Sequence, residues 1–175
     1  TTGTITGTTT GALTVTAGAA NTTVVGAGAT TVDTTLMTSA ETLTLSGAGA
    51  MTVTGHNSTG QVTSSGAGAL TLTSGANNTL VSSAGAATLT TALQTTQTLG
   101  ISGAGAFTIG DWVSTGTLTS SNTADVDITL VARATGTLAL GTDTDGTDTV
   151  VATALTDGQV VTMTGSNNAT VSFAN

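Results

Sequence analysis

A Gly/Ala step followed by alternating apolar residues and threonines recurs six times between positions 11 and 110. The central threonines of the copies stand at positions 14, 31, 52, 71, 88 and 108, so successive copies are offset by 17, 21, 19, 17 and 20 positions. Repeats of this length are typical of stacked supersecondary units, each of which buries its apolar face only against its neighbours. The sequence therefore constrains the architecture more strongly than the activity.

The alternation within each copy predicts a β-strand, with Leu70 and Leu72 on one face and Thr71 and Thr73 on the other. A second strand is expected between successive Gly/Ala steps, at residues 41–46, 79–82, 97–102 and 117–119. Two strands per repeat favour a flattened coil with two sheets. We therefore expect an all-β chain with a repetitive β-solenoid of roughly 17–21-residue coils over residues 11–110. The Gly/Ala steps would form tight corners, where only small side chains permit close approach.

The organisation changes after residue 110, where the Gly/Ala steps stop and Asp111 and Trp112 mark a boundary. Short connections at 156–158 and 165–168 resemble hairpin turns. They predict that residues 111–175 form an antiparallel β cap or mating region. A jelly-roll-like β-sandwich with donor-strand exchange is the alternative fold, because alternating strands also suit that architecture.

The charge balance excludes a basic nucleic-acid interface. Arg133 is the only basic residue, against eight aspartates and Glu41, so nothing displaces phosphate counterions. Catalysis is not expected either. His56 is the sole histidine, the chain has no cysteine or lysine, and no Gly-x-Ser-x-Gly elbow is present, so a nucleophile, a base and an orienting group cannot be assembled. We expect a protein that is not an enzyme.

One acidic turn has the composition of a metal site. Asp143, Asp145 and Asp148 lie within six residues around Gly146. Calcium prefers several oxygen ligands, and alternating carboxylates in a glycine-containing turn can converge on one ion. The turn lacks the distal glutamate of an EF-hand, and aspartates are common in exposed turns. Calcium binding and a solvated turn both remain open from the sequence.

Asparagines recur at the expected turns opposite the Gly/Ala corners. Asparagine tolerates the left-handed conformation and bonds to nearby backbone, so a stack of asparagine turns is the simplest interpretation. Four of them also begin N-glycosylation sequons: Asn21, Asn57, Asn77 and Asn168. The two interpretations are compatible if the turns face solvent, and glycans are then possible partners.

The N-terminal segment is uncharged and strand-prone. Residues 1–10 are a possible donor strand for an adjacent subunit, with main-chain bonds completing a neighbouring sheet edge. Residues 11–16 fit better as the first coil of the chain's own solenoid. The candidate assembly residues are Thr4, Ile5, Thr6, Leu13 and Val15.

The pattern resembles secreted β-solenoid surface or fibre proteins rich in threonine, glycine and alanine, of the filamentous-haemagglutinin, autotransporter-passenger or surface-layer type. The resemblance is carried by the repeat length and residue texture of residues 11–110. It implies an extracellular or cell-surface location and a structural or adhesive role, often in homopolymers of identical subunits.

Three functions follow from these observations. The first is a structural subunit of an extracellular filament or surface assembly, joined by β-strand addition or end-to-end stacking. The second is ice binding, because the threonine pairs at 14/16, 52/54, 71/73 and 88/90 would project methyls and hydroxyls from one flat face, with Asp33 and Gly110 interrupting the array. The third is a surface adhesin, for which the sequence shows no ligand site.

Overall fold

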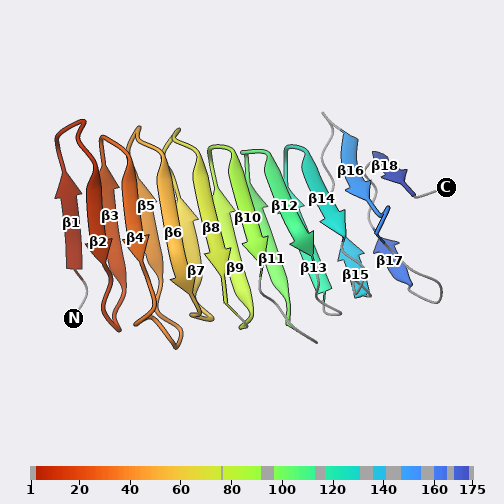
Figure 1. Cartoon of the computed structure of the whole chain (residues 1–175), viewed down its shortest axis with the longest axis horizontal. Coiled ribbons are helices and arrows are strands. Elements are labelled where there is room, and N and C mark those ends of the chain that lie inside the picture. The colour runs from red at the N-terminus through yellow and green to blue at the C-terminus, as the bar shows by residue number, and fades with distance from the viewer. Residues whose placement is uncertain are drawn as a thin grey trace.

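The chain forms a β-solenoid with two strands in each coil. In the computed structural model, residues 3–75, 77–91, 97–112, 117–130, 136–140, 147–154, 160–164 and 168–173 are described. Figure 1 shows the strands stacked along the long axis with little twist, and with the two termini at opposite ends. The strands of this described part belong to two nine-stranded sheets, and no helix occurs among them. The predicted all-β solenoid is confirmed.

The odd-numbered strands make the first sheet and the even-numbered strands make the second. The first sheet contains β1 (Gly3–Gly7), β3 (Thr22–Gly26), β5 (Leu43–Ser46), β7 (Gln61–Ser64), β9 (Thr79–Ser83), β11 (Leu99–Gly103), β13 (Thr117–Asn122), β15 (Gly136–Ala139) and β17 (Val161–Thr164). The second contains β2 (Leu13–Thr16), β4 (Thr30–Asp33), β6 (Met51–His56), β8 (Leu70–Ser74), β10 (Ala87–Thr91), β12 (Phe107–Trp112), β14 (Val126–Leu130), β16 (Thr147–Val151) and β18 (Asn168–Ser172). Each strand pairs with the strand two places along the chain, so each coil contributes one strand to each sheet.

The predicted antiparallel C-terminal region is wrong. β15 pairs with β17 and β16 pairs with β18, and both pairs are parallel. The short connections that resemble hairpin turns join strands of opposite sheets, because β16 lies in the second sheet and β17 in the first. Residues 156–158 and 165–167 lie outside the described part of the chain, but the strands on either side of each connection belong to opposite sheets and are not hydrogen-bonded neighbours. The sandwich alternative fails for the same reason, since all the described strand pairs are parallel.

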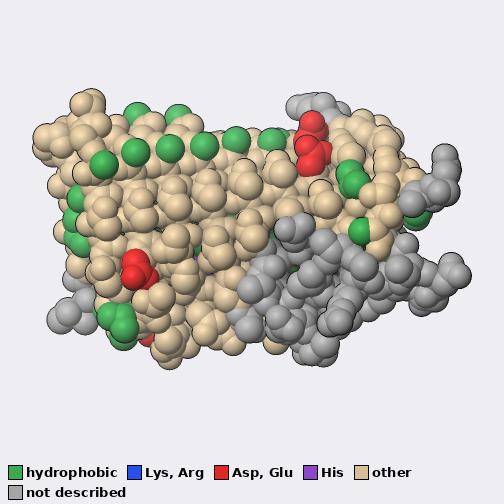
Figure 2. Space-filling model, viewed as in Figure 1, with side chains coloured by type: hydrophobic (Ala, Val, Ile, Leu, Met, Phe, Trp, Pro, Cys, Tyr) green, Lys and Arg blue, Asp and Glu red, His purple; other side chains and the backbone are tan. Residues whose placement is uncertain are grey.

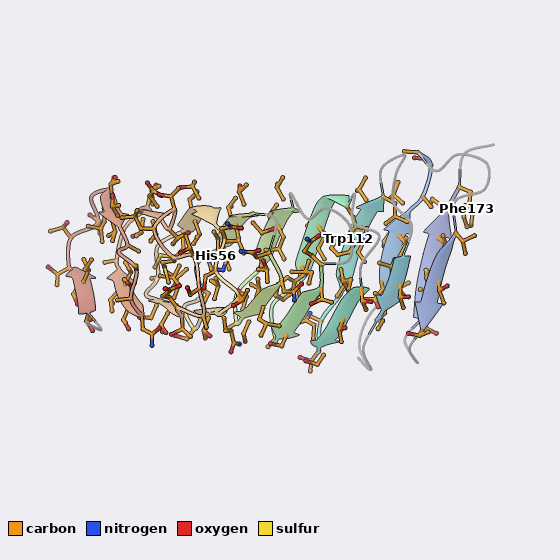
Figure 3. The ribbon with its side chains drawn as sticks, turned by 90° about the horizontal axis from the view of Figure 1, so that it is seen from below. His56, Trp112 and Phe173 are labelled. Atoms are coloured by element: carbon orange, nitrogen blue, oxygen red, sulfur yellow. The ribbon has the colours of Figure 1, made fainter. Side chains whose placement is uncertain are left out.

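A narrow apolar core runs along the axis between the two sheets. The inward residues of each strand follow the predicted alternation. Leu70 and Leu72 of β8 are 0% and 1% exposed, and Leu43 and Leu45 of β5 are both 0% exposed. Figure 3 places Trp112 inside this core, where it is 1% exposed and pairs with Leu130. The second sheet therefore continues across residue 111, with a register shift between Ile109 and Trp112.

The Gly/Ala steps form one row of corners, as expected, and the glycines occupy its crowded positions. A Cβ atom on Gly49 would lie 2.0 Å from the carbonyl oxygen of Gly28, and one on Gly68 would lie 2.0 Å from that of Gly49. The backbones of successive coils therefore touch at these corners. The alanines of the same steps are exposed, so their methyl groups point to solvent.

Candidate functional site

The outward surface of the second sheet from β2 to β12 carries a regular array of threonines. We call this surface the threonine face. Its central row, the first rank, runs strand by strand in direct register through Thr14, Thr31, Thr52, Thr71, Thr88 and Thr108. The rank continues through Asp127, Thr149 and Thr170 on β14, β16 and β18. Repeats that are distant from one another in the chain are thus brought into one line.

A second rank lies two residues further along each strand. Thr16 faces Asp33, which in turn faces Thr54, and Thr73 faces Thr90, which faces Gly110. A β-bulge after Val53 shifts the register between β6 and β8, so it divides this rank into two parts. The threonine pairs expected from the sequence are brought together, and the two expected interruptions are where the sequence places them.

A row of alanines borders the first rank on its other side. Their carbonyl groups continue the strand ladder: the N–H of Leu13 donates to the carbonyl of Ala29, that of Met51 to Ala69, and that of Leu70 to Ala86. These alanines are exposed, and Figure 2 shows a row of hydrophobic side chains along one edge of this side of the molecule. From the sequence these alanines are expected only as small residues at tight corners. The signal that could have revealed the row is their constant place one residue before each inward-facing strand residue.

The spacing of the threonine face follows from strand geometry. Neighbouring strands of a sheet lie about 4.8 Å apart, and alternate residues along a parallel strand lie about 6.6 Å apart. Threonine is β-branched, so its χ1 angle is stiff in a strand and its methyl and hydroxyl groups keep their positions. Most of these threonines are exposed. The face therefore offers a rigid two-dimensional lattice of small groups.

The face is also nearly free of charge. Asp33 is the one charged residue among the described outward side chains of β2–β12, and its carboxylate oxygen accepts a hydrogen bond from the N–H of Thr35. That bond lowers the pKa of Asp33 below its ordinary value. At the far end the array meets Asp127, which takes the first-rank position on β14.

The outward surface of the first sheet is less regular. One of its rows begins with Thr4, Thr23, Thr44 and Thr63 and then changes to Ser82, Ser102 and Ser121. A second row contains Gln61, Leu80, Gly100 and Thr119, and an open groove of about 340 Å³ lies over these residues. Leu80 forms part of it and is 48% exposed. This groove is where a ligand site of an adhesin would be sought first.

Only one of the three aspartates of the expected calcium site lies in the described part of the chain. Asp143 and Asp145 lie outside the described residues. Asp148 is fully buried, and its carboxylate accepts a hydrogen bond from the N–H of Val126 at 2.9 Å. It therefore fixes the start of β14. No group of three histidine, cysteine or acidic side chains that could hold a metal ion occurs in the described part of the chain.

The asparagines of the sequons differ in their contacts. Asn21 is exposed and its side-chain oxygen accepts from the N–H of Thr42 at 2.9 Å. Asn77 donates its side-chain N–H to the carbonyl of Asn57 at 2.6 Å, so these two residues link successive coils. Asn168 is exposed at the start of β18. Glycosylation of these residues stays a prediction.

The expected assembly residues are placed within the chain's own sheets. Thr4, Ile5 and Thr6 belong to β1, which pairs with β3, and Ile5 is 38% exposed. Leu13 and Val15 belong to β2 and face inward, and Val15 is 4% exposed. The first coil thus includes residues expected to act as a donor strand, and the donor role itself stays a prediction.

Comparison with known proteins adds no family to this description. Among the described residues, no helix has the length and apolar character needed to cross a membrane. No family model, curated protein or solved structure matches the chain.

Proposed function

We propose that the threonine face binds ice, and that the protein acts as a rigid solenoid without catalytic activity. The observation that carries this proposal is the unbroken first rank of six threonines on β2 to β12, paired strand by strand. Such a row repeats at about the strand spacing of 4.8 Å, which is close to the repeat of water molecules on the surface of hexagonal ice. Methyl groups and hydroxyl groups at fixed positions can order water into the same pattern.

The rigidity of the face supports binding to a crystalline surface. Each contact between a threonine and ice is weak, so affinity requires many contacts made at once. Groups that are already fixed in the free protein lose little conformational entropy on binding. The stacked backbone and the stiff χ1 of threonine provide this preorganisation.

The difference between the two sheets also supports the proposal. If threonine were present only because it suits exposed strands, the outward rows of both sheets would be equally regular. The first sheet instead changes from threonine to serine along its row and carries Leu80 and Gly100 in the next one. Among the described strands, the threonine rank that runs over six strands occurs only on the second sheet, whereas the row on the first sheet has four threonines before the serines begin.

Thermal hysteresis, the gap between the melting and freezing points of ice in the protein solution, tests the proposal. We expect hysteresis with the unmodified chain and its loss in the variant Thr71→Glu/Thr88→Glu, because two charged side chains would hold ice away from the first rank. The matched control Thr44→Glu/Thr63→Glu changes two threonines that pair on the outward surface of the first sheet, and it should keep the activity. Absence of hysteresis in the unmodified chain, or equal loss in both variants, would overturn the proposal.

A structural role in an extracellular or cell-surface rod is the second proposed function. It is supported by the parallel pairing of each strand with its equivalent in the next coil, since such a stack can be extended at either end by further coils or by a second copy. Val160 and Phe173, near the C-terminal end of the described stack, are 67% and 68% exposed, and Figure 3 shows Phe173 at that end. Electron microscopy and sedimentation velocity test self-association: filaments would support it, and monomers at high protein concentration would contradict end-to-end stacking.

A further inference from the structure

His56 is a titratable side chain buried inside the solenoid. It is the last residue of β6 and is 0% exposed, and Figure 3 places it within the solenoid. The β-bulge between Val53 and His56 causes this placement, because it pairs His56 and not Gly55 with Ser74 of β8. Gly55 has a φ of 67°, in the left-handed region. A bulge commonly redirects a side chain in this way.

Four buried side-chain atoms around His56 have no well-aligned hydrogen-bond partner among the described residues, although the backbone of Gly60 interacts with the ring and raises the pKa of His56. The four atoms are both ring nitrogens of His56, the side-chain oxygen of Asn57 and the hydroxyl of Ser74. They lie in one corner of two successive coils. His56 and Ser74 are paired across the strands, the N–H of Gly75 donates to the carbonyl of His56 at 2.5 Å, and a Cβ atom on Gly75 would lie 2.5 Å from the Asn57 oxygen.

The chemistry of these groups is complementary to water. A neutral imidazole has one donor and one acceptor nitrogen, an amide oxygen accepts, and a hydroxyl can do both. Buried polar groups in folded proteins are nearly always paired with protein or with ordered water. A buried water molecule typically makes about three hydrogen bonds to such groups.

Ionic partners do not account for the burial of His56. Among the described residues of the preceding coil, the carboxylates are Asp33 and Glu41, and each is bonded within its own loop. Asp33 accepts from the N–H of Thr35, and Glu41 accepts from the N–H of Ser39 at 2.7 Å. The imidazole is thus buried among neutral groups.

We propose that this corner is a buried hydration site, in which ordered water joins the ring of His56 to the hydroxyl of Ser74 and the side-chain oxygen of Asn57. The water would link two successive coils at the point where the bulge interrupts the regular ladder. The site lies inside the solenoid and is independent of the threonine face.

A crystal structure at atomic resolution, together with water-to-protein nuclear Overhauser spectroscopy, tests this proposal. We expect ordered water within hydrogen-bond distance of at least one ring nitrogen of His56, and a cross-peak between the ring protons and long-lived water. Ser74→Ala should weaken or abolish that cross-peak, whereas Ser82→Ala, on the outward side of β9, should leave it unchanged. A ring bonded directly to the carbonyl of Gly60, with no water nearby and no cross-peak, would overturn the proposal.

Discussion

Thr52 of β6 and Thr71 of β8 are direct register partners on neighbouring parallel strands, although they belong to different repeats of the chain. The same relation links Thr71 to Thr88 and Thr88 to Thr108. The irregular repeat length does not disturb it, because additional residues lie in the connections between strands. Differences in coil length are therefore compatible with an uninterrupted rank.

Completing the second rank should strengthen binding to ice. A Cβ atom at the position of Gly110 would meet no other atom within 4 Å, so Gly110→Thr would add a threonine next to Thr90 with open space for its Cβ atom. We expect higher thermal hysteresis at equal protein concentration, and a gain in stability of up to about 1 kcal/mol because glycine is unfavourable in a strand. Gly110→Ser serves as the control for the added hydroxyl without the methyl. Unchanged hysteresis in the threonine variant would show that the second rank does not contact ice.

Adding a single methyl group at a corner should destabilise the solenoid. Gly49→Ala would place a Cβ atom 2.0 Å from the carbonyl oxygen of Gly28, and a backbone atom cannot rotate away as a flexible side chain can. We expect a loss of about 1–3 kcal/mol in the free energy of unfolding, the usual cost of overpacking. Chemical denaturation measures it. Gly110→Ala, which adds the same methyl in open space, is the control, and equal effects of the two substitutions would contradict the stacked corner.

The sequence predicted the strands, the two-sheet coil and the glycine corners because each depends on a local period. Leu70 and Thr71 show the alternation directly, and the Gly/Ala steps mark the turns. The direction of the C-terminal pairing could not be derived in this way, because a short turn after β16 looks the same whether it leads to the next strand or to the opposite sheet. The register of Thr71 with Thr88 could not be predicted either, because it depends on how many residues of each repeat lie in the connections between strands.

The interior position of His56 could not be predicted either. In a regular strand that continues from Val53, residue 55 would face the core and residue 56 would face solvent. The bulge reverses this order. A lone histidine before an asparagine turn gives no local sign of the bulge, apart from the glycine at position 55.

Acidification should destabilise the coil that holds His56. Burial lowers the pKa of His56 below 6.5, and the backbone of Gly60 acts in the opposite direction. The unfolded chain therefore binds a proton near pH 6.5 while the folded chain does not, so stability falls as the pH drops from that value toward the lowered pKa. The slope reaches about 1.4 kcal/mol per pH unit for one group.

Denaturation of the unmodified chain and of His56→Leu between pH 7.5 and pH 5 measures this effect. Subtracting the two profiles removes the contribution of the carboxylates that both proteins share. We expect the unmodified chain to lose more stability on acidification than the leucine variant. Parallel profiles would show that His56 takes up its proton equally well in the folded and unfolded states.

Partition into a slowly growing ice crystal is the most direct measurement of the central claim, because it reports binding without requiring that growth be arrested. The unmodified chain, Thr71→Glu/Thr88→Glu and Thr44→Glu/Thr63→Glu would be frozen together with a non-binding protein as reference. Ice binding by the threonine face predicts that the unmodified chain and the first-sheet variant are incorporated into the ice, while the variant of the threonine face is excluded with the reference. Exclusion of the unmodified chain, or incorporation of all three, would contradict ice binding by the threonine face.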